Sequence, residues 1–173
     1  MIRPFSLTDL DRILQIEHLA FPKSPYDGMT FVQLHWLHPD TFWVYVDEGS
    51  KQEEGQLLGY LVFSRNGHII SIAVHPHHRR RGIGKKLIEE AVRRSDLKKL
   101  WAEVRRSNGG AQAFYLKLGF KIVDEIPKYY GNEDALIVTW FPSASKPRKG
   151  NIGLTAKFPF VMDRRPMGRR EKR

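Results

Sequence analysis

The sequence predicts a mixed α/β domain built on a mostly antiparallel sheet, and three features support this. The β-branched run at 69–74 has the length and composition of a buried strand. It leads through a basic loop into a helix that begins at Gly82 or Gly84. A strand at 100–105 follows that helix, and the crossover preference allows it to lie parallel to the earlier strand. We therefore expect a twisted sheet with one parallel strand pair and about four flanking helices.

The N-terminal part is predicted to form one strand and two helices. Residues 1–5 form the strand, and Ser6 or Thr8 can cap the first helix. This helix is expected to end before a loop at 22–28 that contains two prolines and a glycine, and 29–37 form the second helix. The apolar face of the first helix is assigned to Leu7, Leu10, Leu14 and Ala20.

The segment before the basic loop is predicted to be an antiparallel meander. Strands at 41–47 and 56–64 flank a polar turn that ends in glycine. An Asn-Gly pair at 66–67 turns the second strand back into the run at 69–74. Pro76 ends that run because proline lacks a backbone N–H for the ladder.

The basic loop itself is predicted to bind phosphate groups. The first turn of a helix has N–H groups without intrahelical acceptors, and glycines there let a phosphate approach the backbone. Arg79, Arg80 and Arg81 can add their guanidinium groups to these amides. A dinucleotide fingerprint would need glycine at Leu87, and a P-loop would need Gly-Lys followed by Ser or Thr. The loop matches neither of these motifs.

The C-terminal elements follow from periodicity and capping residues. The strand at 100–105 alternates, and Asn108 is a good N-cap for a helix at 109–117. Gly119 is the expected left-handed residue after that helix. Two antiparallel strands at 120–128 and 135–141 complete the domain, and the helix before the alternating strand should bury Ile83, Leu87, Ile88 and Ala91.

Composition narrows the class of protein. The chain has 173 residues, of which 41% are hydrophobic, and it contains no cysteine. Disulfides, cysteine zinc sites and a cysteine nucleophile are therefore excluded. We expect a cytoplasmic protein without a membrane segment, because there is no apolar run of about 18 residues and no signal-peptide pattern at the N-terminus.

The net charge of +10 is concentrated at the C-terminus. Residues 143–173 carry ten Lys or Arg against two acidic residues. The basic pI therefore describes this segment more than the domain. We expect a domain at 1–141 and a basic extension at 142–173.

Two motifs resemble the GNAT family, the Gcn5-related N-acetyltransferases. The first is Arg79-x-x-Gly82-x-Gly84 after a strand that ends Ala73-Val74-x-Pro76, which looks like the family's coenzyme A pyrophosphate loop. The second, more specific motif runs from Asn108 through Tyr115 to Leu118-Gly119-Phe120. The resemblance covers roughly residues 1–141 and implies a GNAT fold in which the parallel strand pair splays apart at the acetyl-CoA site.

The resemblance also implies how acetyl-CoA is bound. The backbone of Ala73 and Val74 would pair with the pantetheine amides, and Asn108 would bond the pantetheine arm near Tyr115. The pyrophosphate would be held by Arg79, Arg80, Arg81, Gly82, Ile83, Gly84 and Lys85. Lys85 and Lys86 have an alternative role as a solvated helix edge.

The catalytic residues are inferred from the RimI-like protein N-terminal acetyltransferases, which the Tyr-Tyr and Glu-Asp-Ala pattern at 129–135 resembles. Glu103 would be the general base, acting through a water, and Tyr115 the acid that protonates the thiolate. Glu103 has an alternative role as a strand carboxylate paired with Arg105 or a neighbouring lysine, and Tyr115 as a packed aromatic.

The expected acceptor is a protein N-terminus. An α-amino group has a reference pKa of about 7.7–8.0, whereas that of lysine is about 10.4, so the N-terminus is more easily deprotonated. Tyr26, Tyr129 and Tyr130 are expected to bind the peptide, although Tyr26 has an alternative role as a surface or hinge aromatic.

Other functions remain open at this point. A lysine or small-amine acetyltransferase is one alternative, because the fold does not fix the acceptor. A nucleic-acid or ribosome-binding protein that works through its basic C-terminal extension is another. His75, His77 and His78 lack the usual spacing of zinc ligands, so we expect no metal and assign them to a polar rim of the coenzyme cleft. A monomer or a homodimer is expected.

Overall fold

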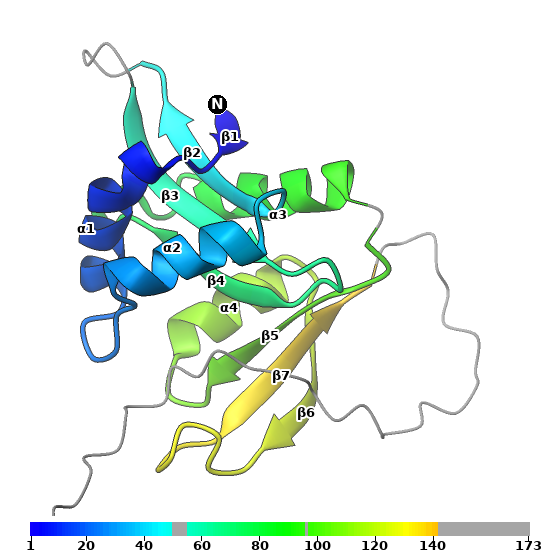
Figure 1. The fold of residues 1–173 in the computed structure, drawn as a ribbon. Helices are drawn as coiled ribbons and strands as arrows, with labels where there is room; N and C mark the ends of the chain where they lie inside the picture. The colour runs from blue at the N-terminus through cyan, green and yellow to red at the C-terminus, as the bar shows by residue number, and fades with distance from the viewer. Residues whose placement is uncertain (50–54, 96, 142–173) are drawn as a thin grey trace, which may run out of the picture. The chain divides into compact units, whose positions relative to one another are not determined.

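The computed structural model describes residues 1–49, 55–95 and 97–141 (Figure 1). The chain divides into two compact units, Met1–Ala102 and a second that begins at Glu103. The first unit contains β1 (Ile2–Pro4), α1 (Leu10–Ala20), α2 (Gly28–Leu37), β2 (Phe42–Asp47), β3 (Gln56–Phe63), β4 (Ile69–Val74) and α3 (Ile83–Arg94), with 3-10 turns η1 (Leu7–Asp9) and η2 (Pro76–His78). Strand β5 (Leu100–Arg105) crosses the boundary, and α4 (Gly109–Lys117), β6 (Lys121–Ile126) and β7 (Ala135–Trp140) follow.

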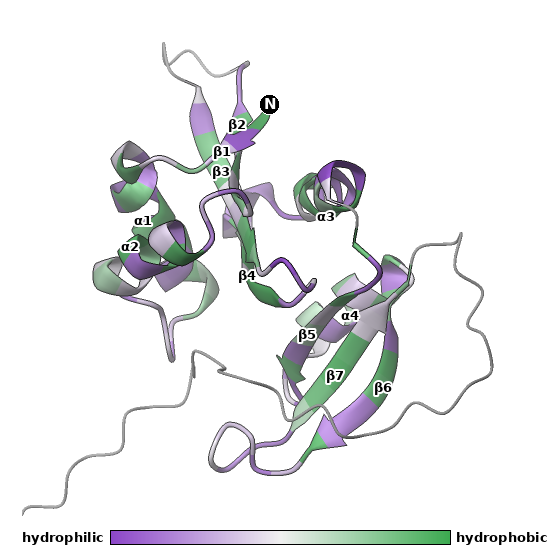
Figure 2. Cartoon of the chain, turned by 45° about the vertical axis from the view of Figure 1, so that its right-hand side comes forward, coloured by the Kyte–Doolittle hydropathy of each residue, from purple (hydrophilic) through white to green (hydrophobic). Residues whose placement is uncertain are grey.

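The first unit is a layered structure around a four-stranded sheet in the order β1-β2-β3-β4. All three strand pairings are antiparallel, which confirms the predicted meander. Helices α1 and α2 cover one face of this sheet and α3 covers the other (Figure 2). Strands β2 and β3 are buried on both faces, which explains why these two read as nearly continuous apolar runs.

An aromatic cluster fills the layer between the sheet and α1 and α2. The Phe5 and Phe42 rings stack with centroids 4.2 Å apart, and Phe31 of α2 meets Tyr60 edge-on at 5.4 Å. Phe31, Phe42 and Tyr60 are fully buried. Such pairs contribute about 0.5–1.5 kcal/mol each beyond the apolar area that they bury.

Helix α3 buries the predicted face against the opposite side of the sheet. Ile83, Leu87, Ile88 and Ala91 are all buried, as the periodicity indicated. Two cations of the helix lie over aromatic rings of β2: Arg94 over Trp43 at 5.5 Å and Lys86 over Tyr45 at 5.6 Å. The helix is thus held by an apolar stripe with cation–π contacts beside it.

The predicted apolar face of α1 is wrong. The buried residues of this helix are Ile13, Ile16 and Glu17, whereas Leu7 lies in the preceding 3-10 turn and is 48% exposed. Leu10 and Leu14 are half-buried and lie beside Gly28, where an added Cβ would come within 3.9 Å of both. The 3-10 turn changes the phase of the helix relative to a continuous α-helix from Ser6.

The second unit is built on a three-stranded sheet in the order β5-β7-β6, with β6 and β7 antiparallel. Both predicted helix signals around α4 are confirmed. Asn108 Oδ1 accepts a hydrogen bond from the Ala111 N–H at 3.0 Å, and Gly119 has φ +89°. The buried residue of α4 is Tyr115, whereas Phe114 and Leu118 are half-buried.

The predicted parallel strand pair is represented by one parallel bridge between His68 and Trp101. It lies where β4 and β5 begin, within the first unit, and the two rings stack with centroids 4.1 Å apart. Beyond this bridge β4 and β5 belong to separate sheets. An added Cβ at Gly67, which has φ +86°, would lie 1.9 Å from the Lys99 carbonyl oxygen, so the close approach here requires glycine.

Candidate functional site

The loop between β4 and α3 has the backbone of an anion site. Arg80 and Gly82 both have left-handed φ values, +65° and +78°, and Gly82 is the N-cap of α3. The first backbone bond of the helix runs from the Lys86 N–H to the Gly82 carbonyl at 2.9 Å. The N–H groups of Ile83, Gly84 and Lys85 therefore precede the helical ladder. These are the donors that would bind a phosphate.

The arginines of this loop are exposed and lie before the helix start. Arg79, Arg80 and Arg81 are all exposed. Arg79 Nε donates to the Val74 carbonyl at 3.2 Å, and Arg81 Nη1 lies 3.4 Å from His78 Nδ1. The structure thus brings the predicted pyrophosphate residues together at one helix terminus.

Ala73 and Val74, the two residues predicted to pair with the pantetheine, differ in the direction of their backbone groups. The His75 N–H donates to the Leu58 carbonyl at 2.8 Å, and Ala73 is paired with Tyr60. Because hydrogen-bonded positions alternate along an antiparallel strand, the Ala73 groups point toward β3 and the Val74 groups point away from it. The Arg79 contact to the Val74 carbonyl agrees with that direction. Val74 is therefore better placed than Ala73 to pair with an added chain.

Gly59 in the middle of β3 is a residue that sequence reasoning missed. A Cβ built on it would lie 2.8 Å from the Ala73 carbonyl oxygen and 3.3 Å from Ile83 Cγ2. A side chain here would force the Ala73 carbonyl of β4 to shift and would crowd the Ile83 side chain of α3. A glycine inside a predicted strand was the signal that could have identified this close approach.

The three loop histidines are neighbours, with ring centroids 5.3 Å (His75–His77) and 5.4 Å (His75–His78) apart, and their place at a rim of the coenzyme cleft stays a prediction. His75 Nδ1 accepts a hydrogen bond from the His77 N–H at 3.3 Å. Burial lowers the pKa of His75, and the nearby charges of Arg12, His78, His77 and Arg79 lower it further. Within the described ranges, no group of three or more His, Asp or Glu side chains could hold a metal ion.

In the second unit, Glu103 lies beside the loop between β6 and β7. Glu103 is half-buried on β5, and the Tyr129 hydroxyl lies 3.4 Å from its Oε1. The Tyr130 hydroxyl lies 3.4 Å from the Glu103 carbonyl oxygen. Both distances are long for O–H···O bonds. One predicted catalytic residue and two predicted peptide-binding tyrosines are therefore neighbours.

A set of ionic contacts holds this loop against the end of β5. The Arg105 guanidinium lies 4.0 Å from the Tyr130 ring centroid, and its Nη1 is 3.2 Å from Glu133 Oε2. The other oxygen of Glu133 accepts the Ser107 N–H at 2.6 Å. The hydrogen bonds from Ser107, and then those from Arg105, hold the pKa of Glu133 below its ordinary value. The ion pair of Arg105 is thus with Glu133.

Asn108 immediately precedes α4, and Tyr115 lies on it. The Asn108 side-chain oxygen caps the helix, as described above. Tyr115 is 5% exposed, and its ring lies 5.1 Å from that of Phe114 and 5.0 Å from that of Phe120. The ring is therefore packed, as the structural alternative anticipated, and the acid role of its hydroxyl stays a prediction.

Tyr26 lies in the first unit, in the loop between α1 and α2. It is only 9% exposed, its ring meets Phe31 edge-on at 6.0 Å, and its N–H donates to Glu17. It is therefore a packed residue of this loop rather than an exposed surface aromatic. Its contact with a peptide stays a prediction.

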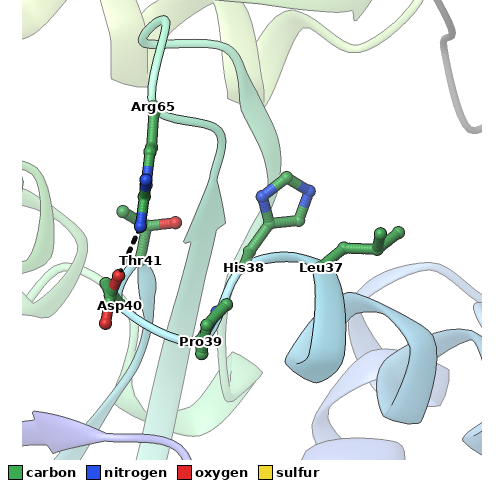
Figure 3. A pocket seen from close by; sticks show the side chains of 6 residues that line it. All are labelled: Leu37, His38, Pro39, Asp40, Thr41 and Arg65. Carbon is green, nitrogen blue, oxygen red and sulfur yellow. Dashed lines mark hydrogen bonds and ion pairs between the residues drawn. The ribbon is translucent and has the colours of Figure 1, made fainter.

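A shallow pocket of about 240 Å³ lies elsewhere, at the C-terminal end of α2. Its lining residues are Leu37, His38, Pro39, Asp40, Thr41 and Arg65 (Figure 3). The ion pair between Arg65 and Asp40, at 2.8 Å, joins two exposed side chains, and such pairs contribute about 0–1 kcal/mol. None of the predicted site residues lines this pocket.

The first unit and the loop before α3 together define an α/β protein in which the N–H groups at a helix start, beside an edge strand, are available to an anion. The sequence profile of the acetyltransferase (GNAT) family matches residues 10–120. An N-acetyltransferase of Methanocaldococcus jannaschii is 33% identical over 156 residues, covering 85% of this chain and 96% of that protein. The N-alpha-acetyltransferase of Sulfurisphaera tokodaii is 32% identical over 157 residues, covering 79% and 90%.

Solved structures give the same result. Ard1 from Thermoplasma volcanium superposes with a TM-score of 0.70 at 29% identity, covering 82% of this chain and 96% of that one. The Escherichia coli ribosomal-protein-S18-alanine N-acetyltransferase gives 0.67 at 27% identity, covering 80% and 91%. The chain belongs to the GNAT acetyltransferase family and is an N-acetyltransferase. The expected co-substrate, acetyl-CoA, is confirmed with it. No helix among the described residues is long and apolar enough to cross a membrane.

Proposed function

We propose that this enzyme transfers the acetyl group of acetyl-CoA to the α-amino group of a protein or peptide N-terminus. The observation that carries the proposal is the cluster of Glu103 with Tyr129 and Tyr130, which combines a carboxylate with two phenols at one loop. Relatives named N-alpha-acetyltransferase and ribosomal-protein-bS18-alanine N-acetyltransferase support the choice of acceptor.

The reaction requires a neutral amine. Its nitrogen attacks the thioester carbonyl, a C–N bond forms and the C–S bond breaks. Glu103, acting through a water, takes the proton that the nitrogen loses, and Tyr115 protonates the departing thiolate. An α-amino group suits a carboxylate base better than a lysine does, because its reference pKa of about 7.7–8.0 leaves a useful neutral fraction near pH 7.

The coenzyme is assigned mainly to the first unit. The N–H groups at the start of α3 and the three arginines before it would bind the pyrophosphate. The outward-facing groups of Val74 would pair with the pantetheine, and Arg79 would then leave the Val74 carbonyl. Asn108 of the second unit would bond the pantetheine arm through its side-chain amide.

The acceptor peptide is assigned to three tyrosines. Phenol hydroxyls can hydrogen-bond the first peptide groups of an extended chain, while their rings contact its side chains. Tyr129 and Tyr130 lie edge-on with ring centroids 4.9 Å apart, which presents two differently oriented rings from one loop. Tyr26 would contribute from the loop between α1 and α2.

The test compares acceptors that differ only at their amines. Peptides with a free N-terminus and no lysine, and peptides with a blocked N-terminus and an internal lysine, are incubated with acetyl-CoA and purified enzyme. We expect acetylation of the first set, at the α-amino nitrogen by mass spectrometry, and little of the second. Acetylation of internal lysines with none at free N-termini would contradict the proposal.

A second proposal concerns the division of the chain. Residues 1–141 are assigned to the catalytic domain and the basic extension at 142–173, which lies outside the described residues, to a contact with a polyanion such as a ribosome. The ten Lys and Arg residues of 143–173, against two acidic residues, support this contact. The apolar residues between 152 and 162 support a rival role, docking on the domain or on a second subunit. The first role is compatible with a monomer and the second with a homodimer.

A further inference from the structure

Glu17 of α1 is a carboxylic acid in the core of the first unit. Its relative exposure is 0%, and it lies on the same buried side of the helix as Ile13 and Ile16. Burying a carboxyl group costs several kcal/mol unless hydrogen bonds replace those to water. An apolar residue would fill this position without that cost, so the contacts made by the carboxylate indicate what it does.

The carboxylate contacts a loop on one side and the sheet on the other. Oε1 accepts a hydrogen bond from the Tyr26 backbone N–H at 2.9 Å, and Oε2 accepts one from the Tyr60 hydroxyl. The Tyr60 oxygen also lies 2.9 Å from Ser71 Oγ on β4. Tyr60 and Ser71 are buried at 0% and 4% exposure. The loop backbone is thus joined through Glu17 to two strands of the sheet.

Glu17 holds both ends of the same loop. Its backbone carbonyl accepts the Phe21 N–H at 2.8 Å, where α1 ends, while its side chain accepts the Tyr26 N–H just before α2. Asp27 then caps α2 through the Thr30 N–H at 2.8 Å. One residue therefore fixes the entrance and the exit of the segment at 21–27.

We infer that Glu17 is a positioning residue that sets the α1–α2 loop in the conformation that receives the acceptor peptide. The inference rests on the proposed role of Tyr26 in binding that peptide. A loop that is already ordered loses less conformational entropy when the acceptor binds, so its anchor favours acceptor affinity. In this assignment Glu17 acts on the acceptor through the Tyr26 backbone.

The experiment uses three test variants and one control variant of the full chain. Glu17→Leu removes both side-chain bonds and fills the space with apolar atoms. Glu17→Gln keeps an oxygen for the Tyr26 N–H and supplies an amide N–H to the Tyr60 oxygen. Tyr60→Phe removes the sheet side of the link only. Val44→Ala, at a fully buried position of β2, is a control for general destabilisation of the same unit.

The measurements are KM and kcat for a free-N-terminus peptide, calorimetric affinity for acetyl-CoA, and hydrogen exchange at the Tyr26 amide. For Glu17→Leu we expect peptide KM to rise roughly 10- to 100-fold, which corresponds to the loss of the buried hydrogen bond from the Tyr26 N–H. Its kcat should change less than about threefold and its acetyl-CoA affinity should be unchanged. Hydrogen exchange at the Tyr26 amide should be faster in Glu17→Leu than in wild type. In Glu17→Gln the peptide KM and the exchange rate should both stay close to wild type. Tyr60→Phe should raise the peptide KM by less than Glu17→Leu does.

Three outcomes would overturn the inference. One is an unchanged exchange rate at the Tyr26 amide in Glu17→Leu, which would show that Glu17 does not hold the loop. Another is faster exchange with peptide KM within about twofold of wild type, which would separate the anchor from the acceptor. The third is an equal rise in KM in Val44→Ala, which would make the effect one of stability. A wild-type enzyme active only on lysines would refute the proposed acceptor, whereas the exchange rate would still decide whether Glu17 holds the loop.

Discussion

At the scale of single residues, the proposed chemistry depends on the carboxylate of Glu103 and the phenol of Tyr115. Glu103→Gln keeps the shape of the side chain and removes its ability to take a proton, and Tyr115→Phe removes the proton donor. We expect each variant to lower kcat by about 100- to 10,000-fold, the usual contribution of a general acid or base. Steady-state assays with a free-N-terminus peptide at saturating acetyl-CoA would measure this loss.

Two controls belong to this prediction. Calorimetry should give an acetyl-CoA affinity close to that of wild type, and thermal melting should show a folded protein, since Tyr115 is packed against Phe114 and Phe120. Wild-type turnover in both variants would mean that the chemistry rests on other groups or on deprotonation of the amine in solution.

At the scale of elements, the start of α3 carries the coenzyme assignment. Gly84→Glu adds bulk and a negative charge in the first turn, where the N–H groups and the helix dipole favour an anion. We expect its calorimetric affinity for acetyl-CoA to fall sharply. Lys86→Glu is the matched control. It changes the charge more, but it lies at an exposed position whose N–H already donates the first helical hydrogen bond, to the Gly82 carbonyl. An equal loss in both variants would indicate a general charge effect instead of a site at the helix start.

The loop between β6 and β7 is the second element with a measurable property. The pKa of Glu133 is lower in the folded state than its unfolded value of about 4.5. Its carboxylate therefore stabilises the folded state fully at pH values above the unfolded pKa. This contribution is lost as the pH falls through the lower pKa of the folded state. We expect the melting temperature of wild type to exceed that of Glu133→Gln at pH 7, and the difference to shrink below about pH 4.5. If the difference in melting temperature stays constant down to pH 3, the stabilisation by Glu133 does not depend on its ionisation.

Local signals predicted most elements, and tertiary contacts explain the failures. The strand at 100–105, the buried face of α3 and the cap at Asn108 depend on neighbours in the sequence, and all three were predicted correctly. The face of α1 was wrong because a 3-10 turn shifts its phase. Glu17 and Gly59 were missed because their roles come from contacts with residues distant in the sequence.

The candidate site was predictable to the extent that a motif describes it. The helix start with its arginines, and the meeting of Glu103 with Tyr129 and Tyr130, follow motifs in the sequence. The direction of the Val74 backbone groups cannot be predicted from a motif, because it depends on the register between β3 and β4. The pairing of Arg105 with Glu133 likewise joins residues from two elements, and the sequence offered Glu103 as a nearer partner.

At the scale of the whole chain, charge is divided unevenly between the domain and the C-terminal extension. Residues 143–173 carry a net charge of +8, from ten basic and two acidic residues, out of +10 for the chain. A segment of this kind binds polyanions by releasing their counterions, and each phosphate contact adds about 0.7–0.9 to the slope of log affinity against log salt concentration. Its contribution should therefore be separable from catalysis on a short peptide.

Deleting residues 143–173 should leave turnover on a short neutral peptide nearly unchanged and should weaken binding to RNA, with a smaller salt slope in titrations at several salt concentrations. The apolar residues between 152 and 162 favour another result if they dock on the domain or a second subunit: the truncated protein would then melt at a lower temperature or lose mass in solution. Light scattering and thermal melting, run beside the RNA titration, separate these two roles. Unchanged RNA affinity, melting temperature and mass would contradict both, because neither charge nor apolar contact from the extension would then contribute to binding or stability.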